Sequence, residues 1–147
     1  MEIRKATLKD LNIVAELFDA YRQFYSQTPN LEAARNFIKD RIRQDQSVIF
    51  LAIDENEKGA GFTQLYPSFT SVGMKRLWVL NDLFVHEDFR RMGLGEQLIE
   101  KARQLARETN ASGLMLETEV SNTSAQGLYD KMGFKRSDAY YVYYLTV

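Results

Sequence analysis

The chain has 147 residues, a typical length for one domain with one hydrophobic core. It carries 19 basic and 20 acidic residues and a formal net charge of −1, so nucleic-acid binding through phosphate neutralisation has little support. Because the chain has no cysteine, it can form neither a disulfide nor a thiolate metal site, and its single histidine, His86, leads us to expect no metal.

The N-terminus and the apolar runs bear on location and domain number. The first residues lack the apolar stretch of a signal peptide, and no apolar run approaches the roughly 20 residues of a membrane span. We therefore expect a cytoplasmic protein with no membrane partner. No repeat or low-complexity linker divides the chain, so residues 1–147 are interpreted as one domain.

The first half of the sequence shows clear helix and strand periodicities. Thr7 and Asp10 resemble a capping box at the start of a helix, and Pro29-Asn30 separates this helix from the next. In chain order we predict a strand, two helices and two hairpin strands at residues 2–6, 11–25, 31–42, 47–53 and 60–65.

The second half begins with residues 75–85, whose near-continuous apolar run predicts a central strand buried on both faces. A helix, a strand, a short helix and two strands then follow at 94–110, 114–120, 122–133, 134–136 and 140–147. The last strand is rich in tyrosine, and its exposed face could serve a homodimer. Because hairpins and crossovers alternate, we expect a mixed sheet in an α/β or α+β fold.

A loop rich in arginine and glycine gives the strongest chemical signal. It lies where a buried strand leads into a helix, so free backbone N–H groups and the positive end of the helix dipole should form an anion site. A P-loop would need Lys-Ser/Thr where Glu96-Gln97 stands, and a dinucleotide fingerprint would need glycine at Leu98. Gly93 and Gly95 alone would equally suit a simple strand-to-helix turn.

The motif Arg90-x-x-Gly93-x-Gly95 resembles the pyrophosphate loop of GNAT-superfamily acetyltransferases. The order of elements is similar to that of the family, and so is a later motif, Asn122-x-x-Ala125-x-x-Leu128-Tyr129-x-x-Met132-Gly133-Phe134. The resemblance covers essentially the whole chain. It implies a splayed mixed sheet of about seven strands, flanked by about four helices.

The resemblance also implies acetyl-CoA as co-substrate and assigns roles to particular residues. The backbone of the fourth strand would pair with pantetheine at Leu83, Phe84 and Val85. The loop would hold the pyrophosphate through Arg90, Arg91, Met92, Gly93, Leu94 and Gly95. Asn122 would contact acetyl-CoA, and Tyr129 would lie near the thioester sulfur and assist the departing thiolate. From the residues alone, Asn122 could be a plain helix cap and Tyr129 a packing residue.

Asn81-Asp82 is a polar pair within an otherwise apolar strand. One interpretation is a bulge with Asp82 held by hydrogen bonds, and the other is that both residues line the acceptor side of an active site. The strand is similar to the fourth strand of polyamine acetyltransferases, but Asn81 replaces the acid that is a proposed base there. Together with the segment ending at Tyr25, it resembles the histone and polyamine acetyltransferase-related branch, so Asn81, Asp82 and Tyr25 are candidate substrate-binding residues.

The predicted activity is direct attack of a primary amine on the thioester of acetyl-CoA. The amine belongs to a polyamine, an amino acid, a lysine or a peptide. Deprotonating a lysine-like amine at pH 7 costs about 4.6 kcal/mol, whereas an α-amino group costs only about 1 kcal/mol. A strong base therefore matters mainly for the first class. The alternative function is a non-catalytic sensor or interaction module that binds acetyl-CoA.

Overall fold

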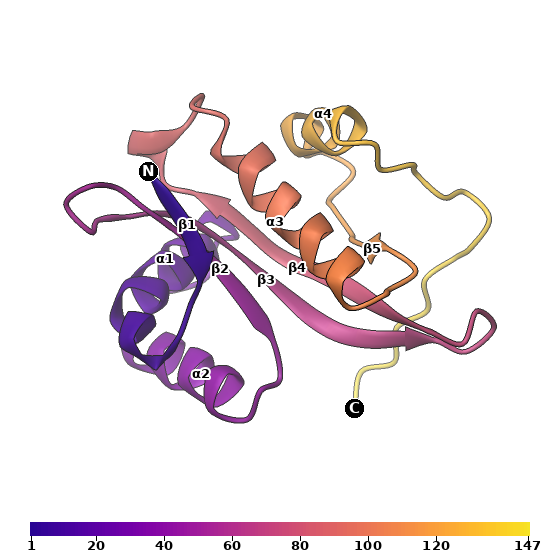
Figure 1. Cartoon of the computed structure of the whole chain (residues 1–147), viewed down its shortest axis with the longest axis horizontal. Helices are drawn as coiled ribbons and strands as arrows, with labels where there is room; N and C mark the ends of the chain where they lie inside the picture. The colour runs from indigo at the N-terminus through magenta and orange to yellow at the C-terminus, as the bar shows by residue number, and fades with distance from the viewer. The chain divides into compact units, whose positions relative to one another are not determined.

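A five-stranded mixed sheet, with strand order β1-β2-β3-β4-β5, forms the first part of the structure (Figure 1). The computed structural model describes residues 1–147, which divide into two compact units, 1–117 and 118–147. The sheet belongs to the first unit, and its strands are β1 (Glu2–Lys5), β2 (Val48–Ile53), β3 (Gly59–Thr70), β4 (Lys75–Val85) and β5 (Leu114–Met115). The first four strands pair antiparallel, and β4 pairs parallel with β5.

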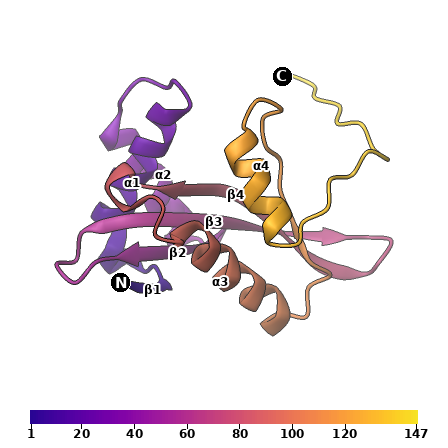
Figure 2. The same cartoon turned by 90° about the horizontal axis from the view of Figure 1, so that it is seen from above.

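Helices cover both faces of this sheet, as Figure 2 shows. Helices α1 (Leu11–Phe24) and α2 (Leu31–Arg43) bury their apolar stripes in one core cluster with β2, β3 and Phe84 of β4. Helix α3 (Leu94–Glu108) packs on the other face through Leu94 and Leu98. None of the helices is long and apolar enough to cross a bilayer.

Local signals place the helix starts where the sequence predicts them. The Thr7 and Asp10 capping box is present and opens a short 3-10 helix, η1 (Leu8–Asp10), that continues into α1. The Asn30 side chain accepts a hydrogen bond from the backbone N–H of Ala33 and so caps α2. Because each cap satisfies backbone donors that the helix cannot, short polar motifs fix these boundaries.

Strand β4 is an inner strand, as predicted, because it pairs with β3 on one side and with β5 on the other. The pairing with β5 is short and comprises only Trp78 with Leu114 and Val79 with Met115. Burial along β4 also alternates, with Asp82 and Phe84 buried toward α1 and α2 and their neighbours partly exposed. Both faces of β4 are covered nonetheless, because Phe84 packs in the cluster with α1 and α2, and Leu83 and Val85 pack against the cluster that contains α3 residues.

Close contact between β3 and β4 depends on Gly61. A Cβ atom at this position would lie 2.7 Å from the backbone oxygen of Phe84, which is too close for any non-bonded carbon. Gly61 faces Val85 in the register, so glycine lets the strands approach where β4 ends and the arginine loop begins.

The second unit contains helix α4 (Thr123–Lys131). The Asn122 side chain caps it by accepting from the N–H of Ala125 at 3.2 Å, and Gly133 follows its end with a φ of 95°. With α4 the chain has four α-helices, as expected, in a mixed α/β fold.

The strands expected at 134–136 and 140–147 are absent, and the strand expected at 114–120 is only β5, so the sheet has five strands and not seven. A run of aromatic and β-branched residues favours extended backbone, but a strand forms only where a neighbouring strand pairs with its N–H and C=O groups. Residues 134–147 have no ladder partner, and the tyrosines at 140, 141, 143 and 144 are exposed.

Candidate active site

A β-bulge interrupts the pairing of β3 with β4. Gln64 faces Asp82 and the next pair is Leu65 with Leu80, so Asn81 has no partner across the ladder. Bulges bend a strand and redirect its side chains, and they are common next to active sites. The polar pair predicted from the sequence therefore lies at a bulge, with Asn81 exposed and Asp82 only 3% exposed.

Asp82 is held by a network of buried hydrogen bonds. One carboxylate oxygen accepts from Nε2 of Gln64, and the other accepts from Nδ2 of Asn81 at 2.8 Å. Gln64 is fully buried, and its Oε1 accepts from the hydroxyl of Ser47 at 2.8 Å. Burial raises the pKa of Asp82, and hydrogen bonds from Gln64, Asn81 and Tyr21 oppose that increase.

The end of α1 forms an aromatic wall beside this bulge. The Tyr21 hydroxyl donates to the backbone oxygen of Asn81 at 3.4 Å, and the Tyr21 ring contacts Tyr25 edge-on at 5.1 Å. Phe24 contacts Tyr25 in the same way, and the guanidinium of Arg90 lies 5.9 Å from the Phe24 ring. The wall thus extends from the bulge to the arginine loop and brings the predicted residue Tyr25 to the site.

One edge of β4 has no strand partner near its C-terminal end. His86 donates its N–H to the oxygen of Ala60 on β3 at 2.8 Å. Because backbone groups alternate along an antiparallel pair, Phe84 also faces β3, whereas the backbone groups of Leu83 and Val85 face the opposite side. On that side β5 pairs only with the earlier residues 78 and 79.

These edge groups suit an extended ligand that carries amides. Arg90 donates from Nε to the backbone oxygen of Val85 at 3.1 Å, which leaves the N–H groups of Leu83 and Val85 directed outward. An amide-containing arm such as pantetheine could add to the sheet here as a further strand would.

The loop after β4 ends in an open helix N-terminus. Arg91 and Gly93 both have left-handed backbone angles, with φ of 63° and 75°, and Gly93 is the N-cap of α3 without a side-chain hydrogen bond. The first helical bond runs from Gln97 N–H to the Gly93 oxygen, so the preceding N–H groups of Leu94 and Gly95 lack a partner within the helix. With Arg90 and Arg91 exposed nearby, this loop carries the backbone donors and positive charge that a pyrophosphate would need.

The structure groups the predicted residues into two sets. The β4 edge, the arginine-glycine loop, the polar pair and Tyr25 lie in the first unit, and Asn122 and Tyr129 lie on or next to α4 in the second. Asn122 caps the helix, and the Tyr129 ring contacts Phe134 edge-on at 5.7 Å. Their roles toward acetyl-CoA stay predictions.

Sequence reasoning missed the partners of Asp82. Gln64 and Ser47 are polar residues in or beside the apolar strands β3 and β2, and their burial is a signal only when paired with Asp82. A buried amide needs hydrogen-bond partners. The sequence predicts a strand at each of the three positions, but it does not give the register that brings the three side chains together.

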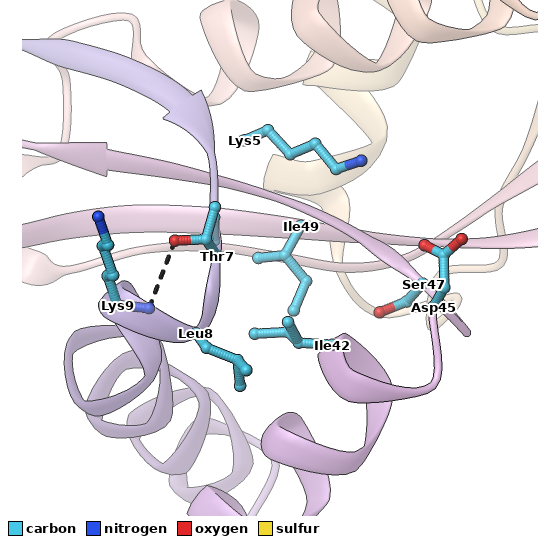
Figure 3. A pocket seen from close by; sticks show the side chains of 9 residues that line it. Lys5, Thr7, Leu8, Lys9, Ile42, Asp45, Ser47 and Ile49 are labelled. Atoms are coloured by element: carbon cyan, nitrogen blue, oxygen red, sulfur yellow. Dashed lines mark hydrogen bonds between the residues drawn. The ribbon is translucent and has the colours of Figure 1, made fainter.

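A separate cavity of about 540 Å³ lies beside the end of β1 and the C-terminal end of α2 (Figure 3). Ile42, Ile49 and Leu8 form its apolar lining, and Lys5 and Asp45 carry charge at its margin. It contains none of the predicted site residues.

Comparison with known proteins agrees with this geometry. The sequence profile of the Acetyltransferase (GNAT) family matches residues 12–134. The chain is 42% identical to the uncharacterized N-acetyltransferase YhfO of Bacillus subtilis (strain 168) over 100% of its own length and 98% of that protein. It is 40% identical to N-alpha-acetyltransferase 30 of Homo sapiens over 64 residues, 44% of this chain and 18% of the human protein. A crystal structure of a probable acetyltransferase matches with a TM-score of 0.94 and 42% identity, over 100% of this chain and 98% of that one. The chain therefore belongs to the GNAT family and is an acetyl-CoA-dependent N-acetyltransferase.

Proposed function

We propose that this protein transfers the acetyl group of acetyl-CoA to a primary amine by direct attack of the amine on the thioester. The observation that carries the proposal is the continuity between the unpaired edge of β4 and the open N-terminus of α3. The edge of β4 offers backbone groups that can pair with amides, and the N-terminus of α3 offers N–H groups, with arginines nearby, that can bind a pyrophosphate. Acetyl-CoA contains both chemistries in one extended molecule.

The order of these two features sets the direction of the bound molecule. With the pyrophosphate at Gly93 and Gly95, the pantetheine arm would run back along β4 past Val85 and Leu83. Its acetyl end then lies toward the bulge, because Asn81 is two residues, or about 7 Å, beyond Leu83. The amine would attack there, beside Asn81 and the ring of Tyr25.

Two further residues would serve the reaction. Tyr129 would donate to the departing thiolate, and Asn122 would contact acetyl-CoA near it. The support for Tyr129 and Asn122 is the family motif in which they occur.

The proposed acceptor class is an α-amino group. Asn81 is exposed at the bulge, whereas both oxygens of the buried Asp82 are already engaged, so the bulge presents no accessible carboxylate as a base. An α-amino group needs about 1 kcal/mol for deprotonation at pH 7, against about 4.6 kcal/mol for a lysine-like amine. The name of the partly similar human N-alpha-acetyltransferase 30 points to the same class.

An acceptor panel tests the proposal. Acetyl-CoA binding is measured by calorimetry, and release of free thiol is followed at pH 7 with alaninamide, glucosamine and 1,4-diaminobutane. We expect turnover, with kcat/KM at least 10-fold higher for alaninamide than for the diamine. Binding without thiol release from any amine would make the protein a sensor, and a preference for the diamine would refute the proposed acceptor class.

A further inference from the structure

The hydrogen-bond network behind the bulge has a fixed polarity. Ser47 donates its hydroxyl proton to Oε1 of Gln64, so Nε2 of Gln64 is the group that donates to Asp82. A carboxylate can only accept hydrogen bonds. The other neighbour, Asn81, must therefore also present its Nδ2, as it does at 2.8 Å.

This polarity determines what Asn81 shows to its surroundings. With Nδ2 directed at Asp82, Oδ1 of Asn81 points away from the carboxylate, and the side chain is exposed. The backbone of the same residue is fixed through its oxygen by the hydroxyl of Tyr21. Both ends of Asn81 are held, and its free acceptor atom lies at the bulge, toward which the acetyl group would point.

We infer that Asp82, supported by Gln64 and Ser47, is a positioning residue that holds Asn81 with its amide oxygen directed toward the acceptor amine. This inference rests on the proposed function and names the residue that orients the acceptor. An N–H of the neutral amine donates to Oδ1 of Asn81, which aims the nitrogen lone pair at the thioester. The N–C bond forms, the C–S bond breaks, the amine releases one proton to solvent, and the departing thiolate takes one up.

The chain of side chains orients the amine and does not carry its proton. Two of its members are amides, which keep their protons near neutral pH and therefore cannot relay one. Asp82 lies behind Asn81 with both oxygens occupied, so it acts on the amine only through Asn81.

Exchange of a single atom at position 82 tests this polarity. In Asp82→Asn, one carboxylate oxygen becomes an NH2 group, which conflicts with one of the two amide donors, whereas the Tyr21 hydroxyl can also accept. Because Gln64 is fully buried and Asn81 is exposed, the amide of Asn81 should be the one that rotates and turns its NH2 group outward. The substrate amine, which would donate its N–H to Oδ1 of Asn81, would then face an NH2 group that cannot accept a hydrogen bond.

A double-mutant cycle measures the coupling with alaninamide as acceptor. Asn81→Ala and Asp82→Asn should each raise the acceptor KM about 3- to 10-fold, the effect of losing one neutral hydrogen bond. The double variant should be no worse than Asn81→Ala alone, because Asp82 acts through Asn81. The Kd for acetyl-CoA should stay within 2-fold throughout, as it should in the control Asn36→Ala, an exposed asparagine on α2.

A second readout does not depend on turnover. In 15N-labelled protein, the Asn81 side-chain amide should show one proton protected from exchange and shifted downfield, and Asp82→Asn should abolish both properties. If the unmodified protein binds acetyl-CoA but releases no thiol with alaninamide, the proposed function fails, while the amide spectrum still tests the positioning.

Four outcomes would overturn the inference. They are an unchanged acceptor KM in Asn81→Ala, an unprotected Asn81 amide in the unmodified protein, single effects that multiply in the double variant, and an equal loss of acetyl-CoA affinity. Asn81→Ala alters only an exposed side chain, so the acceptor KM of this variant tests the inference even if Asp82→Asn does not fold.

Discussion

Asn81 and Asp82 are neighbours in the chain but lie in opposite environments, because the bulge turns one side chain outward and leaves the other buried. The sequence left open whether this pair is structural or functional. The structure shows that Asp82 is inaccessible and that Asn81 has one unengaged acceptor atom. Our proposal therefore gives the buried residue an indirect role and the exposed one a direct role.

Burial of Asp82 should make stability depend on pH. Its pKa is raised in the folded state, so the native protein holds this proton over a pH range in which the unfolded chain has released it. The contribution of Asp82 to the free energy of unfolding should therefore be largest below its unfolded pKa of about 3.9 and fall as pH rises through the folded value.

Urea unfolding at several pH values measures this dependence. Relative to the parent, Asp82→Asn should become progressively more favourable as pH rises from about 4 toward 7, because asparagine does not ionise. A difference between the two proteins that is constant with pH would show that Asp82 has an ordinary pKa.

Tyr129 should assist departure of the thiolate only in part. A phenol has a pKa near 10 against about 8.5 for a thiol, so full proton transfer is uphill by roughly 2 kcal/mol and a hydrogen bond is the expected contribution. Tyr129→Phe should lower kcat by no more than about 10² to 10⁴-fold, with acetyl-CoA affinity preserved. Single-turnover rates would check this, and an undiminished chemical step would return Tyr129 to packing against Phe134.

At the scale of elements, the N-terminus of α3 is the predicted pyrophosphate site. Gly95→Glu would place a side chain and a negative charge beside the first free N–H groups of the helix. We expect it to abolish the rise in Tm that acetyl-CoA produces. Gln97→Glu adds the same charge at an exposed position where the N–H is already bonded, and it should retain most of the rise. Equal responses from the two variants would argue against the site.

Elements differed in how well the sequence predicted them. The starts of η1, α2 and α4 have polar caps a few residues from their targets. The sequence motifs predict the caps at Thr7 and Asn122, whereas at Asn30 they predict only the break between two helices. The link between Gln64 and Asp82 joins residues 18 apart through a register that no local pattern specifies. The last two strands are wrongly predicted for a related reason, because a local aromatic run does not supply a pairing partner.

At the scale of the whole molecule, charge is nearly balanced at −1, so attraction of a polyanionic ligand must be local. Arg90 and Arg91 supply it beside the helix N-terminus. Acetyl-CoA affinity should fall as salt increases, and Arg90→Ala should weaken binding modestly and flatten that dependence, because a solvated charge contact is screened. Calorimetry at about 0.05 and 0.5 M salt tests this, and an unchanged slope would exclude Arg90 from the contact.

The unpaired edge of β4 should leave a pattern in amide hydrogen exchange. Phe84 directs its N–H toward β3, whereas Leu83 and Val85 direct theirs away, so neighbouring residues of one strand should exchange at very different rates. Acetyl-CoA should slow exchange at Leu83 and Val85 and leave Phe84, already slow, nearly unchanged. Such alternation with a period of two residues would show the ligand occupying the place of a neighbouring strand, and uniform protection along β4 would contradict it.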